Sequence, residues 1–370
     1  MHNRWKVIFT SALLVLCGPA RAQWNYDIPF PKSFLPKPDT VTVSFIGDIM
    51  MHAGQLGYDS DGFLSELGPI TRDPDISVAN LEFALAGKPY TGYPSFSAPD
   101  QYAYNIAGRG VDVFLTANNH ILDKGRRGLR RTLNVYDAMR DSLGIQYTGC
   151  AANPSADSLL NPLIVVGKGI RIALVNFTYD NNFKPYDGWP VIRMMEREGV
   201  GQMFSRAKER GADFIVVLPH WGDEFKLRHS REQQEWAEWL VEQGADLIVG
   251  THPHVVQDTS HVCGVPVIYS LGNAVSNMSK ENTRLELAVR ARFVHHPDGA
   301  KEMLEPELTF LWCCLPGTLR DNYVTIPVGD FISRQDEWLD PADYEEMTTT
   351  YQRVIKGTGI YEENYQAGSH

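Results

Sequence analysis

The sequence predicts a layered α/β fold, and two patterns support this prediction. Between about residue 41 and residue 273, short apolar runs typical of buried strands alternate with stretches in which apolar residues recur every three or four positions, as on one face of a helix. Such alternation builds parallel sheets with helices packed on their faces. The helical stretches are residues 125–143, 200–210 and 231–243.

The second pattern is that five of the predicted strands end in polar residues of one chemical kind. In open α/β sheets, ligands bind beyond the carboxyl ends of the strands. Asp, Glu, Asn and His side chains at five such ends are the ligand set of a hydrolytic site with two metal ions. The apolar runs are residues 41–46, 76–79, 111–116, 214–218 and 247–249, and the polar residues that follow them are Asp48, Glu82, Asn119 with His120, His220, and His252 with His254.

The last of these runs stops at Gly250, after which His252 and His254 flank Pro253. Side chains of an extended segment alternate between two faces, so the two imidazoles are predicted to point the same way. Pro253 fixes one backbone dihedral between them and stiffens the pair. The segment therefore offers two imidazoles to one centre.

The pattern changes after residue 273. Apolar residues alternate at 285–294 and 308–315 with no helical stretch between them, and the residues that connect them, 295–299, have the composition of a turn. These features predict an antiparallel hairpin. We therefore place one domain at residues 41–330 and a polar C-terminal helix and tail at residues 331–370.

The N-terminus has the form of a secretory signal peptide at residues 1–22. Basic residues precede an apolar run, and Ala20-Arg21-Ala22 matches a small-x-small cleavage site. The run is well short of the ~20 residues that a spanning helix needs, which disfavours a membrane anchor. A lipid anchor on Cys17 is a weaker alternative. We predict export to the periplasm or the exterior, with no stable membrane anchor and a Pro-rich extended lead-in at residues 23–40.

Charge and cysteine content narrow the classes of partner. The chain carries a formal net charge of −11, and residues 1–22 contain three basic and no acidic residues, so the remainder carries about −14. A chain this acidic lacks the basic face that nucleic acid requires.

Four cysteines remain after the leader: Cys150, Cys263, Cys313 and Cys314. An even number permits disulfides in an exported protein, so we interpret them either as core residues or as including one structural disulfide.

Six motifs occur in order between residues 41 and 273 and resemble those of the CapA family of capsule-synthesis proteins, named for poly-γ-glutamate capsule production. The motifs are F-I-G-D-I-M around Asp48, A-N-L-E at Glu82, T-A-N-N-H-I-L-D-K-G around His120, L-P-H-W-G-D-E at His220, V-G-T-H-P-H-V at His252 and Y-S-L-G-N at Asn273. That family is similar to the calcineurin-like metallophosphoesterases. The resemblance implies an α/β four-layer sandwich, two mixed β-sheets flanked by helices, with two divalent metals at strand ends.

The resemblance also implies roles for single residues. Glu82 matches the carboxylate that bridges the metals, Asp48 and His254 match ligands of one metal, and the ligands implied for the other metal are Asn119, His220 and His252. This sequence departs from the family's common first motif, D-x-H, because Met50 occupies the histidine position. His52, two residues further on, is the candidate substitute.

The predicted chemistry follows from these residue types. Two divalent ions that share a carboxylate and a water lower the pKa of that water and stabilise the attacking and leaving oxygens. His120 is our candidate for the general acid that protonates the leaving group, with Asp123 as the residue that orients it. His, Asn and carboxylate ligands suit manganese, iron and zinc alike, so the metal is left open.

Three functions remain open from the sequence. The first is a metal-dependent hydrolase that cleaves a phosphoester or a γ-glutamyl bond of a small-molecule or polymer substrate in the cell envelope, through a hydroxide that bridges the metals. The second is a non-hydrolytic accessory protein for synthesis or export of poly-γ-glutamate. The third is a binding module with a decayed metal centre, which the nearly intact ligand set disfavours. We favour the hydrolase, and the oligomeric state is left open.

Overall fold

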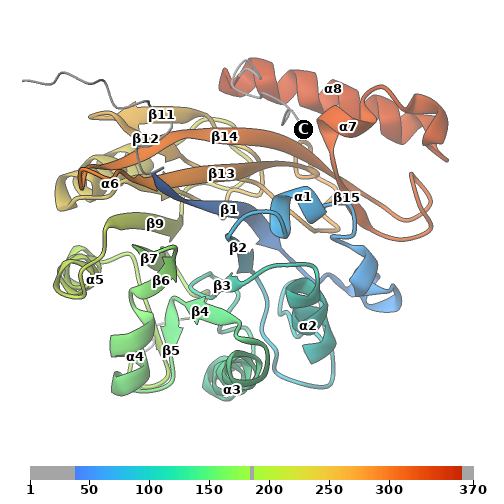
Figure 1. The fold of residues 1–370 in the computed structure, drawn as a ribbon. Coiled ribbons are helices and arrows are strands. Elements are labelled where there is room, and N and C mark those ends of the chain that lie inside the picture. The colour runs from blue at the N-terminus through green and yellow to red at the C-terminus, as the bar shows by residue number, and fades with distance from the viewer. Residues whose placement is uncertain (1–37, 184–186, 361–370) are drawn as a thin grey trace, which may run out of the picture. The chain divides into compact units, whose positions relative to one another are not determined.

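Two mixed β-sheets and the helices that cover them make up the fold (Figure 1). The computed structural model describes residues 38–183 and 187–360. The predicted signal peptide, residues 1–22, therefore lies outside the described residues, as do most of the lead-in and the last ten residues of the tail. The two mixed sheets flanked by helices that the family resemblance implies are therefore confirmed.

Within the described residues, the first sheet has seven strands and the second has six. In spatial order the first sheet contains β15 (Val324–Pro327), β14 (Lys301–Cys314), β13 (Leu285–His295), β1 (Asp39–Ile49), β2 (Ile76–Leu81), β3 (Val113–Leu115) and β4 (Gln146–Thr148). The second contains β11 (Thr259–Val262), β12 (Val265–Ile268), β10 (Leu247–Val249), β9 (Phe214–His220), β7 (Ile170–Thr178) and β6 (Leu163–Gly167). A separate pair consists of β5 (Cys150–Ala151) and β8 (Val191–Ile192).

Each sheet has a parallel half that leads to the predicted site. In the first sheet β1, β2, β3 and β4 run parallel, and in the second β7, β9, β10 and β12 run parallel. The remaining strands of the first sheet are antiparallel, including the hairpin β13–β14, whose turn follows His295 as predicted. The parallel halves therefore carry the polar strand ends, and the antiparallel strands extend the scaffold.

The helices begin and end close to their predicted limits. The longest is α3, which ends at Leu143 because Gly144 adopts the left-handed conformation, and α6 begins at a capping box formed by Ser230 and Gln233. The α-helices are α1 (Gly68–Thr71), α2 (Asp100–Gly108), α3 (Gly125–Leu143), α4 (Pro154–Leu160), α5 (Arg197–Glu209), α6 (Arg231–Gln243), α7 (Val328–Phe331) and α8 (Pro341–Thr358). Short 3-10 turns occupy Ala53–Gly57, Ser60–Gly62 and Gln335–Glu337. No helix of the described residues is both long enough and apolar enough to cross a membrane.

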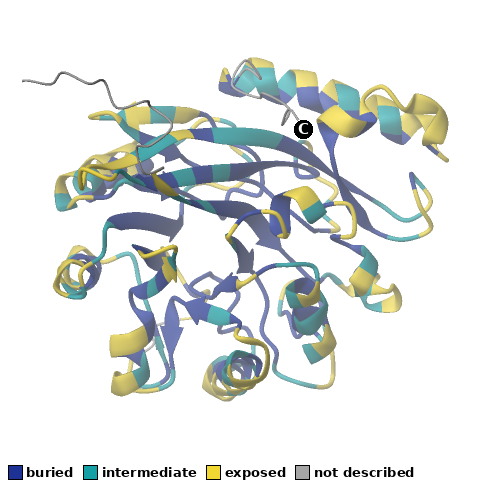
Figure 2. Ribbon diagram, in the orientation of Figure 1, coloured by how far each residue is buried: buried dark blue, intermediate teal, exposed yellow. Residues whose placement is uncertain are grey.

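The second sheet is packed on both faces, as the alternation along β9 shows. Val216 and Leu218 belong to the apolar core shared with the first sheet, whereas Ile215 and Val217 pack with the apolar faces of α5 and α6. Across the two sheets, the rings of Phe214 and Phe293 lie 5.0 Å apart. Figure 2 shows the central strands as buried along most of their length.

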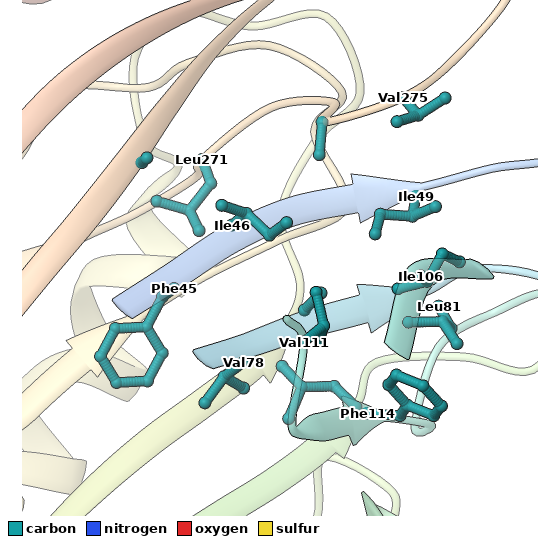
Figure 3. Close-up of a cluster of buried hydrophobic side chains, with 14 of the residues drawn as sticks. Phe45, Ile46, Ile49, Val78, Leu81, Ile106, Val111, Phe114, Leu271 and Val275 are labelled. Carbon is teal, nitrogen blue, oxygen red and sulfur yellow. The ribbon is translucent and has the colours of Figure 1, made fainter. Parts of the chain in front are cut away.

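The first sheet has the same two-sided burial. Figure 3 shows Phe45 and Ile49 of β1 beside Val78 and Leu81 of β2, in one cluster of buried apolar side chains. Buried residues of the C-terminal helix α8 belong to the same core, and the helix packs on β13 and β14. The segment predicted as a polar C-terminal helix is therefore amphipathic, and its apolar face is part of the packed domain.

The four cysteines of the described residues are all free, so none of them forms the disulfide that the sequence left open. Cys150, Cys313 and Cys314 are buried, and Cys263 is exposed. The alternative of core residues is therefore confirmed for the three buried cysteines and is wrong for Cys263.

We expect the contact between the sheets to be a main source of stability. Replacing Phe293, which is fully buried, with alanine (Phe293→Ala) leaves a cavity opposite Phe214 and should lower the free energy of unfolding by about 3–5 kcal/mol. Phe183→Ala is the matched control, because that side chain is 46% exposed and its loss should change stability by less than about 1 kcal/mol. Urea denaturation measures both, and equal effects would contradict the packing described here.

Candidate metal centre

The polar side chains predicted at the strand ends converge on one buried centre, where the parallel halves of both sheets end. Asp48 is the next-to-last residue of β1, Glu82 follows β2, and His220 is the last residue of β9. His252 and His254 follow β10. All five side chains are buried, with exposures of 0–2%. The structure therefore brings together residues from two sheets that are up to about two hundred positions apart.

Asp48 connects three of these segments. One of its carboxylate oxygens accepts a hydrogen bond from Asn80 Nδ2 at 2.7 Å, and the other accepts one from the backbone N–H of His252 at 3.1 Å. The second oxygen also lies 3.5 Å from His254 Nδ1. The carboxylate thereby ties β1 and β2 in the first sheet to the loop after β10 in the second.

Glu82 is fully buried, and neither of its carboxylate oxygens has a hydrogen-bond partner. One of these oxygens lies 3.7 Å from His254 Nε2 and 3.9 Å from His120 Nε2, beyond hydrogen-bonding distance. Burial and the neighbouring Asp48 raise the pKa of Glu82 well above its usual range. A buried carboxylate left without partners costs stability, and a cation is the group that would offset this cost.

His220 is held by hydrogen bonds at both ring nitrogens. Its Nδ1 lies 2.9 Å from Thr251 Oγ1, and its Nε2 lies 2.9 Å from Asn119 Oδ1. Burial, and secondarily the neighbouring histidines, lower its pKa well below the usual range, so the ring is neutral at neutral pH. A neutral imidazole keeps one nitrogen lone pair, which is what a metal ligand requires.

The segment of His252 and His254 differs from the predicted extended conformation. Both residues have positive φ angles, 100° for His252 and 57° for His254, so the period-two argument for their direction is wrong. The two rings nevertheless lie in one cluster, with centroids 5.8 Å apart, because the backbone bends at each histidine. Left-handed conformations of non-glycine residues cost roughly 1–3 kcal/mol each and occur most often at functional sites.

The two rings have opposite electrostatic surroundings. Burial lowers the pKa of His252 well below its usual range, and its Nδ1 has no hydrogen-bond partner. Burial also acts to lower the pKa of His254, but the carboxylates of Glu82 and Asp48 outweigh burial and raise it to about 9. His254 Nδ1 lies 2.9 Å from Asn273 Oδ1, which orients the ring.

Two sets of three side chains offer ligand atoms within 4.8 Å of one another. One set is Asp48, Glu82 and His220, and the other is Glu224, His252 and His254. This grouping differs from the predicted division, which placed His220 with His252 and Asp48 with His254. Glu224 was missing from the predicted ligands, although it lies only four residues after His220 in the same motif.

The proposed acid and its partner are also in place. His120 Nδ1 lies 2.8 Å from Asp123 Oδ2, which in turn accepts a hydrogen bond from the backbone N–H of Phe96 at 2.6 Å. The Phe96 ring packs edge-on against His120, with centroids 4.8 Å apart. Asp123 and Phe96 thus hold the imidazole with Nε2 directed toward Glu82.

Neither residue considered for the missing first-motif histidine joins the centre as a ligand. Met50 is buried in the apolar core, so its side chain is a packing residue. His52 accepts a hydrogen bond at Nδ1 from the backbone N–H of Asn277 and belongs to neither set of ligand atoms found among the described residues. Burial lowers its pKa to about 4.

Buried amides support the ligands, and the sequence did not identify this role. Asn80 donates to Asp48, Asn118 donates to Asn80 Oδ1 at 3.2 Å, and Asn273 lies against His254. A ligand held by such partners keeps one orientation. Asparagine at a strand end more often makes turn contacts, and the sequence offers no signal to separate the two roles.

A further buried carboxylate, Glu286 of β13, contacts the residue that precedes Asp48. Its Oε1 accepts a hydrogen bond from the backbone N–H of Gly47 at 2.5 Å, and its Oε2 has no partner. Burial raises the pKa of Glu286 to about 8. The group is therefore mostly protonated at neutral pH.

This pKa predicts a pH dependence of stability. The pKa of Glu286 is 4.5 in the unfolded chain and about 8 in the folded protein, so the folded state binds the proton more tightly. The resulting contribution to the free energy of unfolding is complete below pH 4.5 and is lost as the pH rises through 8. Glu286→Gln keeps an acceptor for Gly47 and removes the ionisation, so at pH 9 it should be more stable than the unchanged protein by a few kcal/mol. Denaturation at pH 5, 7 and 9 with chelator present measures this. The control is Glu66→Gln, at an exposed glutamate, which should leave the pH profile unaltered.

Comparisons with known proteins identify the family of the chain. The family described as "Bacterial capsule synthesis protein PGA_cap" matches residues 42–278. The chain is 27% identical to the PGA biosynthesis protein CapA of Bacillus subtilis over 315 residues, which cover 80% of each chain. It is also 27% identical to the capsule biosynthesis protein CapA of Bacillus anthracis over 261 residues, 66% of this chain and 62% of that protein.

Solved structures with a similar fold include two nucleotidases. The 5′-nucleotidase precursor of Thermus thermophilus gives a TM-score of 0.45 at 14% identity, covering 86% of this chain and 59% of the other. The NAD nucleotidase of Haemophilus influenzae gives 0.45 at 14% identity, covering 86% and 63%. The match to the family extends from β1 through the loop after β12 and includes all six candidate ligands of the two sets. Because it covers more than half of the chain, the chain belongs to the bacterial capsule synthesis protein family, PGA_cap.

Proposed function

We propose that the protein is an exported, metal-dependent hydrolase that cleaves a phosphoester or a γ-glutamyl bond in a substrate of the cell envelope. The observation that carries this proposal is the buried Glu82 carboxylate, which has no hydrogen-bond partner and lies among three histidines and a second carboxylate. This arrangement is unfavourable for a folded protein by itself and suits bound divalent cations.

The residues present fit such ions. Asp48, Glu82 and His220 form one candidate set of ligands, and Glu224, His252 and His254 form the other. His220 and His252 are neutral, as metal ligands must be, because burial lowers the pKa of each. Divalent ions held there supply charge stabilisation and a lowered pKa for water in hydrolytic reactions.

The chain's own residues supply orientation and a proton. Asp123 accepts from His120 Nδ1, which leaves Nε2 directed at the centre and able to deliver a proton to a leaving group. Tyr179 packs over His252, with ring centroids 4.4 Å apart, and covers this part of the centre. Both features suit a general acid beside a water-poor reaction centre.

Export is part of the proposal and rests on the predicted signal peptide at residues 1–22. The relatives are named for capsule biosynthesis, and a capsule lies outside the cell. The polymer that these names imply would place the substrate in the same compartment as an exported enzyme.

The second candidate function is a non-hydrolytic accessory role in synthesis or export of poly-γ-glutamate. The observation that favours it is the naming of both relatives for biosynthesis. The replacement of the expected first-motif histidine by Met50, whose side chain is packed in the core, also suits a centre with a weaker metal position. Turnover by the purified protein separates the two functions.

Metal content is the first test. The unchanged protein should retain up to about two divalent ions per chain after dialysis, measured by inductively coupled plasma mass spectrometry. Glu82→Gln and His252→Ala should each lower that content, because each removes a ligand. His261→Ala is the control, since His261 is exposed and belongs to neither candidate set. Metal below about a tenth of an ion per chain under replete conditions would sink the enzyme proposal.

Turnover is the second test. His120→Ala and Asp123→Asn should lower kcat on phosphoester or γ-glutamyl substrates by about 10²–10⁴ while metal content stays the same. Asp123→Asn should also alter the pH–rate profile, because the amide cannot hold the imidazole as the carboxylate does. The control is Asp141→Asn, at an exposed residue of α3. If metal is bound and a broad panel of such substrates stays uncut, the accessory function is favoured.

A further inference from the structure

A basic cavity lies between the loop after Glu82 and the first turns of α3. Its volume is about 580 Å³. Four of its lining residues are cationic and none is acidic, in a chain whose net charge is −11. The cationic residues are Lys88, Lys124, Arg127 and Arg131.

Most of this charge is uncompensated. Arg131 is paired with Asp100 at 2.7 Å and also donates to the Leu85 carbonyl oxygen. Within the residues that the structure describes, Lys88, Lys124 and Arg127 form no ion pair, and Lys88 has only the Tyr90 ring nearby, 5.9 Å from its ammonium. Three cations thus face one cavity without a carboxylate among them.

The first turn of α3 adds to the positive potential. It contains no acidic residue, whereas Lys124 and Arg127 lie at its start. Helix N-termini carry partial positive charge and favour negative groups, so the start of α3 adds to the positive potential that an anion would meet in the cavity.

Two segments that line the cavity also carry the residues that hold His120. Lys124 directly follows Asp123, and Ser97 directly follows Phe96. Asp123 accepts hydrogen bonds from both His120 and the Phe96 backbone, so the two segments are joined at the residues that hold the proposed general acid. The cavity is therefore connected to the metal centre through its lining segments.

We propose that this cavity is an anion subsite that binds a carboxylate or phosphate group carried by the substrate. Lys124 and Arg127 provide the main contacts, with Lys88 closing the open side. The inference deepens the proposed function and rests on it for the identity of the neighbouring reaction. Its binding step does not need metal or turnover, so the two proposals can fail separately.

The test is equilibrium binding to the metal-free full chain, measured by isothermal titration calorimetry in chelator. The two probes are a γ-linked glutamate hexamer, which offers carboxylates, and tripolyphosphate, which offers phosphates. The double variant Lys124→Gln/Arg127→Gln should weaken binding of the preferred probe by about tenfold or more, the loss expected of a charge-assisted contact. Lys88→Gln alone should give a smaller loss.

The matched control is Arg130→Gln, which removes the same charge from the same helix outside the cavity. It should change affinity by less than about twofold, because Arg130 does not line the cavity, its guanidinium lies near the Trp189 carbonyl oxygen, and exposed charges contribute little by themselves. The probe that binds more tightly identifies the group recognised.

Three results overturn the inference: neither probe binds, the double variant binds as tightly as the unchanged protein, or Arg130→Gln weakens binding equally. The last result would mean that the anionic probe is attracted by the positive charge of the helix as a whole and not by the cavity. If the protein binds no metal but the cavity still binds the preferred probe, the proposed function is contradicted and the anion subsite is supported.

Discussion

The structure depends on one electrostatic constraint: two carboxylates, Asp48 and Glu82, are buried beside histidines where the strands of two sheets end. Hydrogen bonds from Asn80 and from the His252 backbone stabilise the Asp48 carboxylate. The Glu82 carboxylate has no such hydrogen bond, and burial raises its pKa. Because uncompensated buried charge is among the most unfavourable features a fold can hold, the surrounding packing must stabilise the centre.

That packing comes from both sheets. The second sheet is covered by α5 and α6 and faces the first through contacts such as Phe214 with Phe293, so the loops after β9 and β10 rest on rigid supports. A rigid support allows backbone conformations that are costly by themselves, including the positive φ angles of His252 and His254. The same scaffold positions the amides of Asn80, Asn118 and Asn273. Stability of the core is thus what makes a strained and charged site possible.

The charged side chains are distributed unevenly, with cations gathered in one cavity of an acidic chain. An acidic chain would repel an anionic polymer over most of its surface, yet the cavity lined by Lys88, Lys124 and Arg127 has no acidic residue in its lining. The basic subsite and the metal centre together form a local exception to the chain's overall charge. Such an exception favours one route of approach for an anion and disfavours non-specific binding elsewhere.

The sequence by itself determined the elements and the chemistry at their ends. Apolar periodicity placed α3 and α6 and the strands that carry Asp48, Glu82 and His220, because both signals are local. It also placed the hairpin β13–β14. Only the tertiary structure decided which candidate ligands lie close together, that Glu224 lies with His252 and His254, and that Asn80 and Glu286 pack against the segment of Asp48. Those relations join residues far apart in the chain, and the directions of side chains on bent loops follow from packing between sheets, which no local pattern encodes.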